Sequence, residues 1–240
     1  NLGINVIWMT PIVEQIHDGV DEGTGFTYGF HGYWTRDWTA MDPSFGTRKD
    51  LTELVQKAHA LGIKIMLDAV INHTGPVTPE DSVYPNDWVR TSPKCTYQSY
   101  DTYINCTLVD NLPDVKTENN EAVELPTFLV NKWKKEGRYD KEVASLDAFF
   151  IKTGYPRAPK YYIMKWLSDY ITDFGIDGYR VDTVKHTTED VWADFKKVCD
   201  RAFAEYKKNN PKKVIPEFQF EIIGAKENDY INQILVEMKE

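Results

Sequence analysis

The sequence predicts an α/β fold with a parallel sheet, because short apolar runs alternate with segments of helical periodicity. The run 63–70 is apolar except at Lys64 and Asp68, as expected for a strand that is buried on both faces. Apolar residues recur at helical spacing over 51–61, and Gly62 follows as a helix terminator. Periodicity alone leaves open whether the sheet is doubly wound or closed into a barrel.

This alternation recurs along the chain. Further strands are predicted at 5–9, 176–181 and 214–223, and further helices at 163–174 and 191–202. The run at 5–9 is apolar enough to be a buried strand. The long intervening segment is rich in Pro, Asn, Asp and Tyr and has little periodicity, which predicts a loop-rich inserted subdomain that walls a cleft. The chain is therefore divided into 1–74, 75–159 and 160–240.

Composition excludes several classes of function. With 240 residues, 42% of them hydrophobic, the chain can bury the core of one large domain. A net charge of -9 disfavours a surface that follows nucleic-acid phosphates, and no run of about eighteen apolar residues predicts a membrane span. Seven Trp and fourteen Tyr suit either a large aromatic core or stacking on flat, uncharged ligands. Composition does not set the oligomeric state.

The three cysteines have different settings. Cys95 and Cys106 bracket a Tyr- and Thr-rich stretch and are close enough in sequence to close a loop. A disulfide there would imply an oxidising compartment, and a pair of free thiols is the alternative. Cys199 falls on a predicted helical stripe, which indicates a small buried residue.

Polar residues follow the predicted strands, where α/β folds place reactive groups. They form three groups: Asp68, Asn72 and His73; Arg180, Asp182, Lys185 and His186; and His31, Tyr33 and Trp34. Arg180 and Asp182 are two apart on a strand and so share a face. A guanidinium favours an ionised neighbouring carboxylate, which makes Asp182 a candidate nucleophile. A structural ion pair is the alternative interpretation.

Four segments resemble the sequence motifs of glycoside hydrolase family 13, the α-amylase family. Gly178–His186 resembles the family's Gly-x-Arg-x-Asp-x-x-Lys-His signature, and Asp68–His73 is similar to its Asp- and Asn-His-containing segment, here with Asp and Asn four apart. Leu112-Pro113-Asp114 resembles the short motif of its calcium-binding subdomain, and His31–Trp34 its aromatic sugar-stacking loop. The segments occur in the family's order across nearly the whole chain, and the loops are most similar to those of periplasmic or secreted bacterial α-amylases.

The resemblance implies a (β/α)8 TIM barrel with a subdomain inserted after the third strand. This chain would supply about strands two to five, as an excerpt, a truncated product or a fragment that needs its missing half. The implied activity is retaining hydrolysis of α-1,4-glucosidic bonds in starch-like glucans, in the periplasm or outside a bacterial cell.

The resemblance also implies roles for individual residues. Asp182 would be the nucleophile and Arg180 its orienting partner. The residues expected to bind substrate are His31, Tyr33, His73, Lys185 and His186, with Tyr33 stacking on the sugar and Lys185 serving the neighbouring subsite. Calcium would be bound by Asn72, Asp114 and the backbone carbonyl of His186, because oxygen donors suit a hard cation.

A retaining mechanism also needs a second carboxyl group about 5 to 5.5 Å from the nucleophile. In the family this Glu follows a Gly at the end of the next strand, and alignment on Gly224 places Ala225 there. Glu221 could serve if the strand ended four residues earlier. Two other interpretations remain: a catalytically inactive glucan-binding module, and an α-glucan transglycosylase that uses the same residues.

Overall fold

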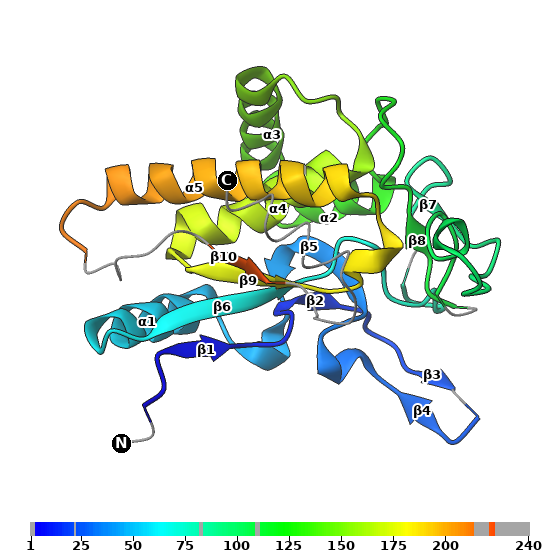
Figure 1. Cartoon of the computed structure of the whole chain (residues 1–240), viewed down its shortest axis with the longest axis horizontal. Helices are drawn as coiled ribbons and strands as arrows, with labels where there is room; N and C mark the ends of the chain where they lie inside the picture. The colour runs from blue at the N-terminus through cyan, green and yellow to red at the C-terminus, as the bar shows by residue number, and fades with distance from the viewer. Residues whose placement is uncertain (1–2, 22, 82–83, 109–110, 214–220, 224–240) are drawn as a thin grey trace.

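A four-stranded parallel sheet forms the centre of the protein, with the strand order β1-β6-β9-β10 (Figure 1). The computed structural model describes residues 3–21, 23–81, 84–108, 111–213 and 221–223. The strands are β1 (Val6–Trp8), β6 (Lys64–Ala69), β9 (Gly178–Val181) and β10 (Glu221–Ile223). The predicted parallel strands are therefore confirmed within the described residues, and positions 214–220 of the fourth lie outside them.

Helices connect these strands, as predicted from the alternating pattern. The connecting helices are α1 (Arg48–Ala60), α4 (Pro159–Phe174) and α5 (Glu189–Asn209). Helix α1 packs on β6, and α4 and α5 pack side by side (Figure 1). The start of α1 is fixed by a capping box, in which Thr47 and Asp50 each accept a backbone hydrogen bond from the other residue.

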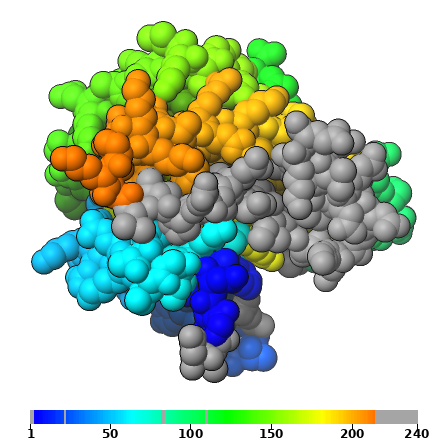
Figure 2. Space-filling model, turned by 60° about the vertical axis from the view of Figure 1, so that its left-hand side comes forward, coloured from blue at the N-terminus to red at the C-terminus, as the bar shows by residue number. Residues whose placement is uncertain are grey.

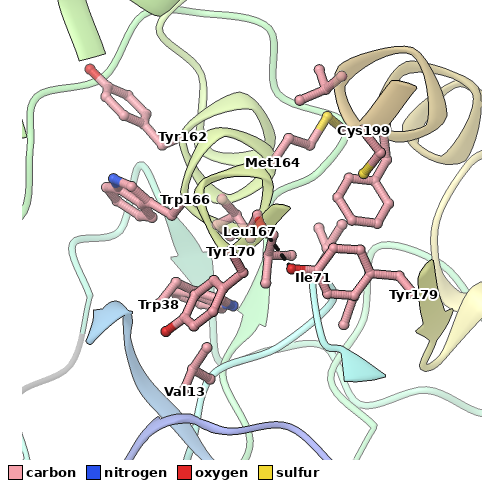
Figure 3. Packing of buried hydrophobic residues seen from close by; sticks show 14 of the residues in the cluster. Val13, Trp38, Ile71, Tyr162, Met164, Trp166, Leu167, Tyr170, Tyr179 and Cys199 are labelled. Carbon is pink, nitrogen blue, oxygen red and sulfur yellow. Dashed lines mark hydrogen bonds between the residues drawn. The ribbon is translucent and has the colours of Figure 1, made fainter. Parts of the chain in front are cut away.

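The core lies around α4, which is buried along most of its length. Figure 3 shows Trp38 and Val13 packed on one side of this helix and Tyr179 and Cys199 on the other. The hydroxyl of Tyr179 donates to the backbone oxygen of Leu167 at 2.7 Å, which satisfies a buried polar group inside the apolar cluster. The prediction that Cys199 is a small buried residue is confirmed, and its thiol is free.

Strand β1 differs from the prediction. The expected strand forms, but it is not buried: Ile7 is 37% exposed and Trp8 53% exposed. In the described part of the chain β1 pairs only with β6, so it is an edge strand with one open side. Figure 2 shows this N-terminal segment at the molecular surface.

Residues 75–159, predicted as a loop-rich inserted subdomain, contain more regular structure than the sequence predicted. Its short elements are β7 (Val89–Arg90), η3 (Tyr100–Thr102) and β8 (Asp114–Val115). Two helices follow, α2 (Thr127–Lys135) and α3 (Tyr139–Thr153), which the low periodicity of the segment did not indicate. Cys95 and Cys106 form a disulfide, so the loop-closing alternative holds.

A buried ion cluster joins α2 to the two-stranded sheet that precedes α1. The sheet consists of β2 (Val13–Gln15) and β5 (Thr35–Met41). Lys132 of α2 forms ion pairs with Glu14 and with Asp37, whose side chain is fully buried. Because a buried charge is stable only when it is paired, this cluster fixes α2 against the sheet.

The remaining elements are small. They are the hairpin of β3 (Val20–Asp21) and β4 (Phe26–Thr27), and the 3-10 helices η1 (Gly29–His31), η2 (Pro43–Phe45) and η4 (Val184–His186). No helix among the described residues combines the length and apolar composition needed to cross a membrane.

The end of α4 provides a test of this packing. Gly175 has φ +75°, and a Cβ there would lie 2.1 Å from Cζ of the buried Tyr206 ring. We expect Gly175→Ala to lower the free energy of unfolding by about 3 kcal/mol, because a left-handed penalty adds to a steric clash. Urea denaturation measures the change.

Gly154 is the matched control, because it ends α3 with φ +73° and a Cβ added there would meet no atom within 4 Å. Gly154→Ala should lower the free energy of unfolding by only about 1 kcal/mol. Equal losses at the two positions would show that the Tyr206 contact is unimportant.

Candidate active site

An arginine lies between two carboxylates at the carboxyl ends of β6 and β9. The parallel register pairs Asp68 with Arg180. Nη1 of Arg180 donates to Oδ1 and Oδ2 of Asp68 at 3.2 and 3.0 Å, and to Oδ1 of Asp182 at 2.9 Å. Asp182 lies two residues beyond Arg180 and therefore on the same face of the sheet. The structure thus brings the predicted nucleophile and its orienting partner together.

Tyr33 joins this cluster from the segment before β5. Its hydroxyl donates to Oδ2 of Asp68 at 3.0 Å. Burial and the nearby Asp68 carboxylate raise the pKa of Tyr33 to about 12, so the phenol stays protonated. Burial raises the pKa of Asp68 to about 6, although Arg180 acts in the opposite direction. Asp68 belongs to a polar group and to a family-like motif in the sequence, but these predicted no role of its own for it.

Trp8 is a second residue that the sequence analysis did not assign to the site. The guanidinium carbon of Arg180 lies 5.5 Å from the centroid of the Trp8 ring, within the range of a cation–π contact. Trp8 pairs with Met66 of β6, which places its ring beside the cluster. An apolar run in the sequence gave no indication that this Trp faces a polar site.

The chain turns sharply just after Asp182. Thr183 has φ +53°, a left-handed conformation that is strained for a β-branched residue. This turn leads directly into η4, which carries Lys185 and His186. The side chain of Asp182 is 18% exposed, whereas that of Asp68 is fully buried. Asp182 is therefore the carboxylate of this cluster that a ligand can reach.

Two histidines flank the cluster and are held by backbone oxygens. Nε2 of His73 donates to the oxygen of Tyr33 at 3.2 Å, and Nδ1 of His186 donates to the oxygen of Tyr103 at 2.7 Å. Burial lowers the pKa of both rings, with the Asp182 charge acting in the opposite direction. Neutral, fixed imidazoles of this kind can exchange hydrogen bonds with ligand hydroxyl groups.

His31 and Lys185 each lie beside a tyrosine ring. Nδ1 of His31 accepts the backbone N–H of Tyr33 at 3.0 Å, and the two rings stack with centroids 5.9 Å apart. His31 therefore supports Tyr33. Nζ of Lys185 lies 5.5 Å from the centroid of the Tyr103 ring, on the side of the site that faces the inserted segment.

Two of the three predicted calcium ligands, Asn72 and Asp114, lie on neighbouring backbone segments. The backbone N–H of Val115 donates to the oxygen of Asn72 at 2.7 Å, and His73 forms a β-bridge with Asp114. One carboxylate oxygen of Asp114 pairs with Arg90 at 3.1 Å. The other oxygen, and the side-chain oxygen of Asn72, are buried without a hydrogen-bond partner among the described residues.

A hard cation fits this arrangement. Burial raises the pKa of Asp114 to about 8, and a bound divalent cation would favour its ionised form. No three His, Cys, Asp or Glu side chains gather into a metal site in the described ranges. A cation here would therefore be held by the amide and carboxylate oxygens of Asn72 and Asp114 together with a main-chain carbonyl.

The pairing of β10 with β9 indicates whether Glu221 is placed to be the second carboxyl group. Glu221 pairs with Gly178, which is four residues before Asp182. At roughly 3.3 Å per residue, the backbone of Glu221 lies about 13 Å short of the level of Asp182 along the strand direction. This separation disfavours Glu221 as the acid. Ala225, the aligned position, lies outside the described residues.

The fold and the site together define a class of protein. A family model for the alpha amylase catalytic domain matches residues 1–237. The chain belongs to this α-amylase family of glycoside hydrolases.

Individual relatives agree with this assignment. The chain is 32% identical to the periplasmic alpha-amylase of Escherichia coli, over 93% of the chain and 39% of that protein. It is 31% identical to an alpha-amylase of Streptomyces lividans, over 83% of the chain and 24% of that protein. The crystal structure of an alpha-amylase from Geobacillus thermoleovorans, complexed with acarbose, matches with a TM-score of 0.63 and 26% identity, covering 97% of the chain and 39% of that structure. The chain thus spans less than two fifths of each of these relatives.

The electrostatics of the cluster can be tested by titration. In the full-length protein, Arg180→Met should raise the pKa of Asp68 above its value of about 6, because the guanidinium that lowers it is removed. Carboxyl ¹³C NMR measures this pKa. Since the folded-state value exceeds the unfolded value of about 3.9, Asp68 makes the free energy of unfolding fall as the pH rises from about 4 to 6.

Lys185→Met is the matched control, because it also replaces a cation of the site with Met, and Lys185 is not among the groups that mainly set the pKa of Asp68. The pKa of Asp68 in the Lys185→Met variant should equal its pKa in the wild type. An Asp68 pKa that Arg180→Met leaves unchanged would contradict the proposed coupling.

Proposed function

We propose that this protein is a retaining glycoside hydrolase that cleaves α-1,4-glucosidic bonds in starch-like glucans, with Asp182 as the nucleophile. The observation that carries the proposal is the accessible Asp182 carboxylate held at 2.9 Å by Arg180 at the end of β9. Membership of the α-amylase family supports the substrate class.

Each residue of the site would have a separate role in the reaction. Asp182 attacks the anomeric carbon, and the bond to the leaving oxygen breaks to give a glycosyl-Asp182 intermediate. Arg180 fixes the direction of the Asp182 carboxylate by its hydrogen bond to Oδ1. The ring of Tyr33, oriented by its hydrogen bond to Asp68, stacks on the same sugar. His73 and His186 bind hydroxyl groups of the substrate, and Lys185 serves the adjacent sugar.

Turnover also requires a second carboxyl group that protonates the leaving oxygen and then activates water. The β10 register favours a residue other than Glu221 for this role. A second candidate function follows from the same observation: the protein binds α-glucans at this site without cleaving them.

The parallel sheet and its helical connections are consistent with about strands two to five of a (β/α)8 barrel, with the segment after β6 as an inserted subdomain. The Cys95–Cys106 disulfide and the periplasmic relative support a periplasmic or extracellular location. We further propose calcium as a structural ion, held by Asn72, Asp114 and the backbone oxygen of His186.

The nucleophile can be tested directly. The full-length protein should release reducing ends from soluble starch and, with an activated 2-fluoro sugar, should gain one glycosyl mass on Asp182. Asp182→Asn should lose activity by about 10⁴-fold or more, because the covalent route is removed. Mass spectrometry of peptides locates the label.

The two candidate functions give different results in this experiment. A glucan-binding protein without catalysis should bind maltoheptaose but release no reducing ends and form no adduct. If the wild type is active and Glu221→Gln abolishes activity, Glu221 is the acid despite its register. A well-folded full-length protein that carries its label on another residue would exclude Asp182 as the nucleophile.

Calcium can be tested by thermal unfolding. If Asn72 and Asp114 bind calcium, a chelator should lower the melting temperature of the full-length protein by about 5 °C, because a ligand bound only to the folded state stabilises it. Asn72→Ala and Asp114→Ala should each remove most of this difference. A chelator that leaves the melting temperature of the wild type unchanged would exclude the ion.

A further inference from the structure

A loop of the inserted segment is closed covalently beside the candidate active site. The disulfide joins Cys95 to Cys106. The backbone N–H of Cys95 donates to the oxygen of Thr107 at 2.9 Å, and that of Thr107 donates to the oxygen of Pro93 at 2.8 Å. Loop 95–106 therefore has a fixed base, so the side chains that it carries have limited freedom.

Two tyrosines of loop 95–106 contact η4. The Tyr103 ring lies beside Lys185, and its main-chain oxygen accepts a hydrogen bond from His186. The Tyr97 ring lies edge-on to the His186 ring, with centroids 6.1 Å apart, and 5.4 Å from the Tyr103 ring. The two tyrosines thus form an aromatic surface next to Lys185 and His186, which follow Asp182 by three and four residues.

Tyr97 combines an accessible ring with a fixed orientation. Its side chain is 44% exposed, the hydroxyl donates to the oxygen of Leu108 at 2.9 Å, and Tyr103 donates to the Tyr97 backbone oxygen at 3.2 Å. Because the hydroxyl is used within the protein, the ring offers its apolar surface to a ligand. An aromatic ring that is held in place binds with little further loss of conformational entropy.

The backbone of Tyr97 is strained. Its φ is +58°, in the left-handed region that a bulky side chain rarely adopts. Among the described residues, three non-glycine residues have positive φ: Tyr97 and Asn105 in the loop, and Thr183 beside Asp182. Strain of this kind persists only where the surrounding structure enforces it, and it concentrates at ligand-binding sites.

We propose that Tyr97 is a sugar-stacking residue that determines how well the protein binds glucans longer than the units around the cleaved bond. The closed loop 95–106 is what holds its ring in place. The inference rests on the proposed function, because the ligand is the glucan chain bound at Asp182. The apolar face of the Tyr97 ring suits the C–H face of a glucose unit that lies beside Lys185 and His186.

The test uses a substitution that fits the backbone but removes the ring. In the full-length protein, Tyr97→Gly should raise the KM for maltoheptaose about five- to tenfold, since one aromatic contact is lost, and should change that for maltotriose less than about twofold. Its melting temperature should equal or exceed that of the wild type, because Gly adopts positive φ without strain. Tyr97→Phe keeps the ring but loses the hydrogen bond to Leu108, so its KM should stay much closer to the wild-type value than that of Tyr97→Gly.

Gln98→Ala is the control within the same loop and should keep the wild-type KM. The hydrogen bond of Gln98 to Thr102 uses the backbone N–H, which the substitution retains. A Cys95→Ser/Cys106→Ser double variant should raise the KM for maltoheptaose. If the disulfide acts through Tyr97, adding Tyr97→Gly to this variant should raise that KM little further.

The possible outcomes separate the two proposals. An active enzyme in which Tyr97→Gly leaves the maltoheptaose KM unchanged overturns this inference alone. A Tyr97→Gly variant that is destabilised and equally impaired on both substrates assigns Tyr97 a structural role and also overturns it. A full-length wild type that neither hydrolyses nor binds maltoheptaose overturns the proposed function and this inference with it.

Discussion

The site depends on the pairing of Arg180 with two carboxylates across adjacent parallel strands. The β6–β9 register places Asp68 directly opposite Arg180, and the pleat of β9 returns Asp182 to the same face. A one-residue slip of either strand would turn one partner away from the others. The buried core around α4 fixes this register, because it packs against β9 through Tyr179 and the Leu167 backbone. The position of the accessible carboxylate is therefore set by packing remote from it.

The two carboxylates that Arg180 binds differ because their surroundings differ. Asp68 is fully buried and bound by both Tyr33 and Arg180, so it serves to orient those side chains. Asp182 has partial exposure and precedes the strained turn at Thr183. One guanidinium thus links a buried carboxylate to one that a ligand can reach. This division of roles follows from burial, since both residues have the same chemistry.

Sequence patterns predicted the features that depend on local spacing. The apolar run of β6, the stripe of α4 and the shared face of Arg180 and Asp182 all follow from periods of two or 3.6 residues. Helices α2 and α3 gave a weak signal because each buries only two apolar residues: Leu129 and Trp133 in one, Leu146 and Phe150 in the other. The exposure of Trp8 and the contact of Tyr97 with His186 depend on neighbours distant in the chain, which periodicity does not reveal.

The inserted segment and the sheet contribute different properties to one site. The carboxylates and Arg180 belong to the strands and the turn after them, whereas Asp114 bridges to His73 and Tyr103 receives a hydrogen bond from His186. Both histidines are thus positioned in part by the insertion, and Asp182 is positioned by the sheet. The disulfide closes the loop that carries Tyr103, so it limits the freedom of the backbone group that accepts the hydrogen bond from His186.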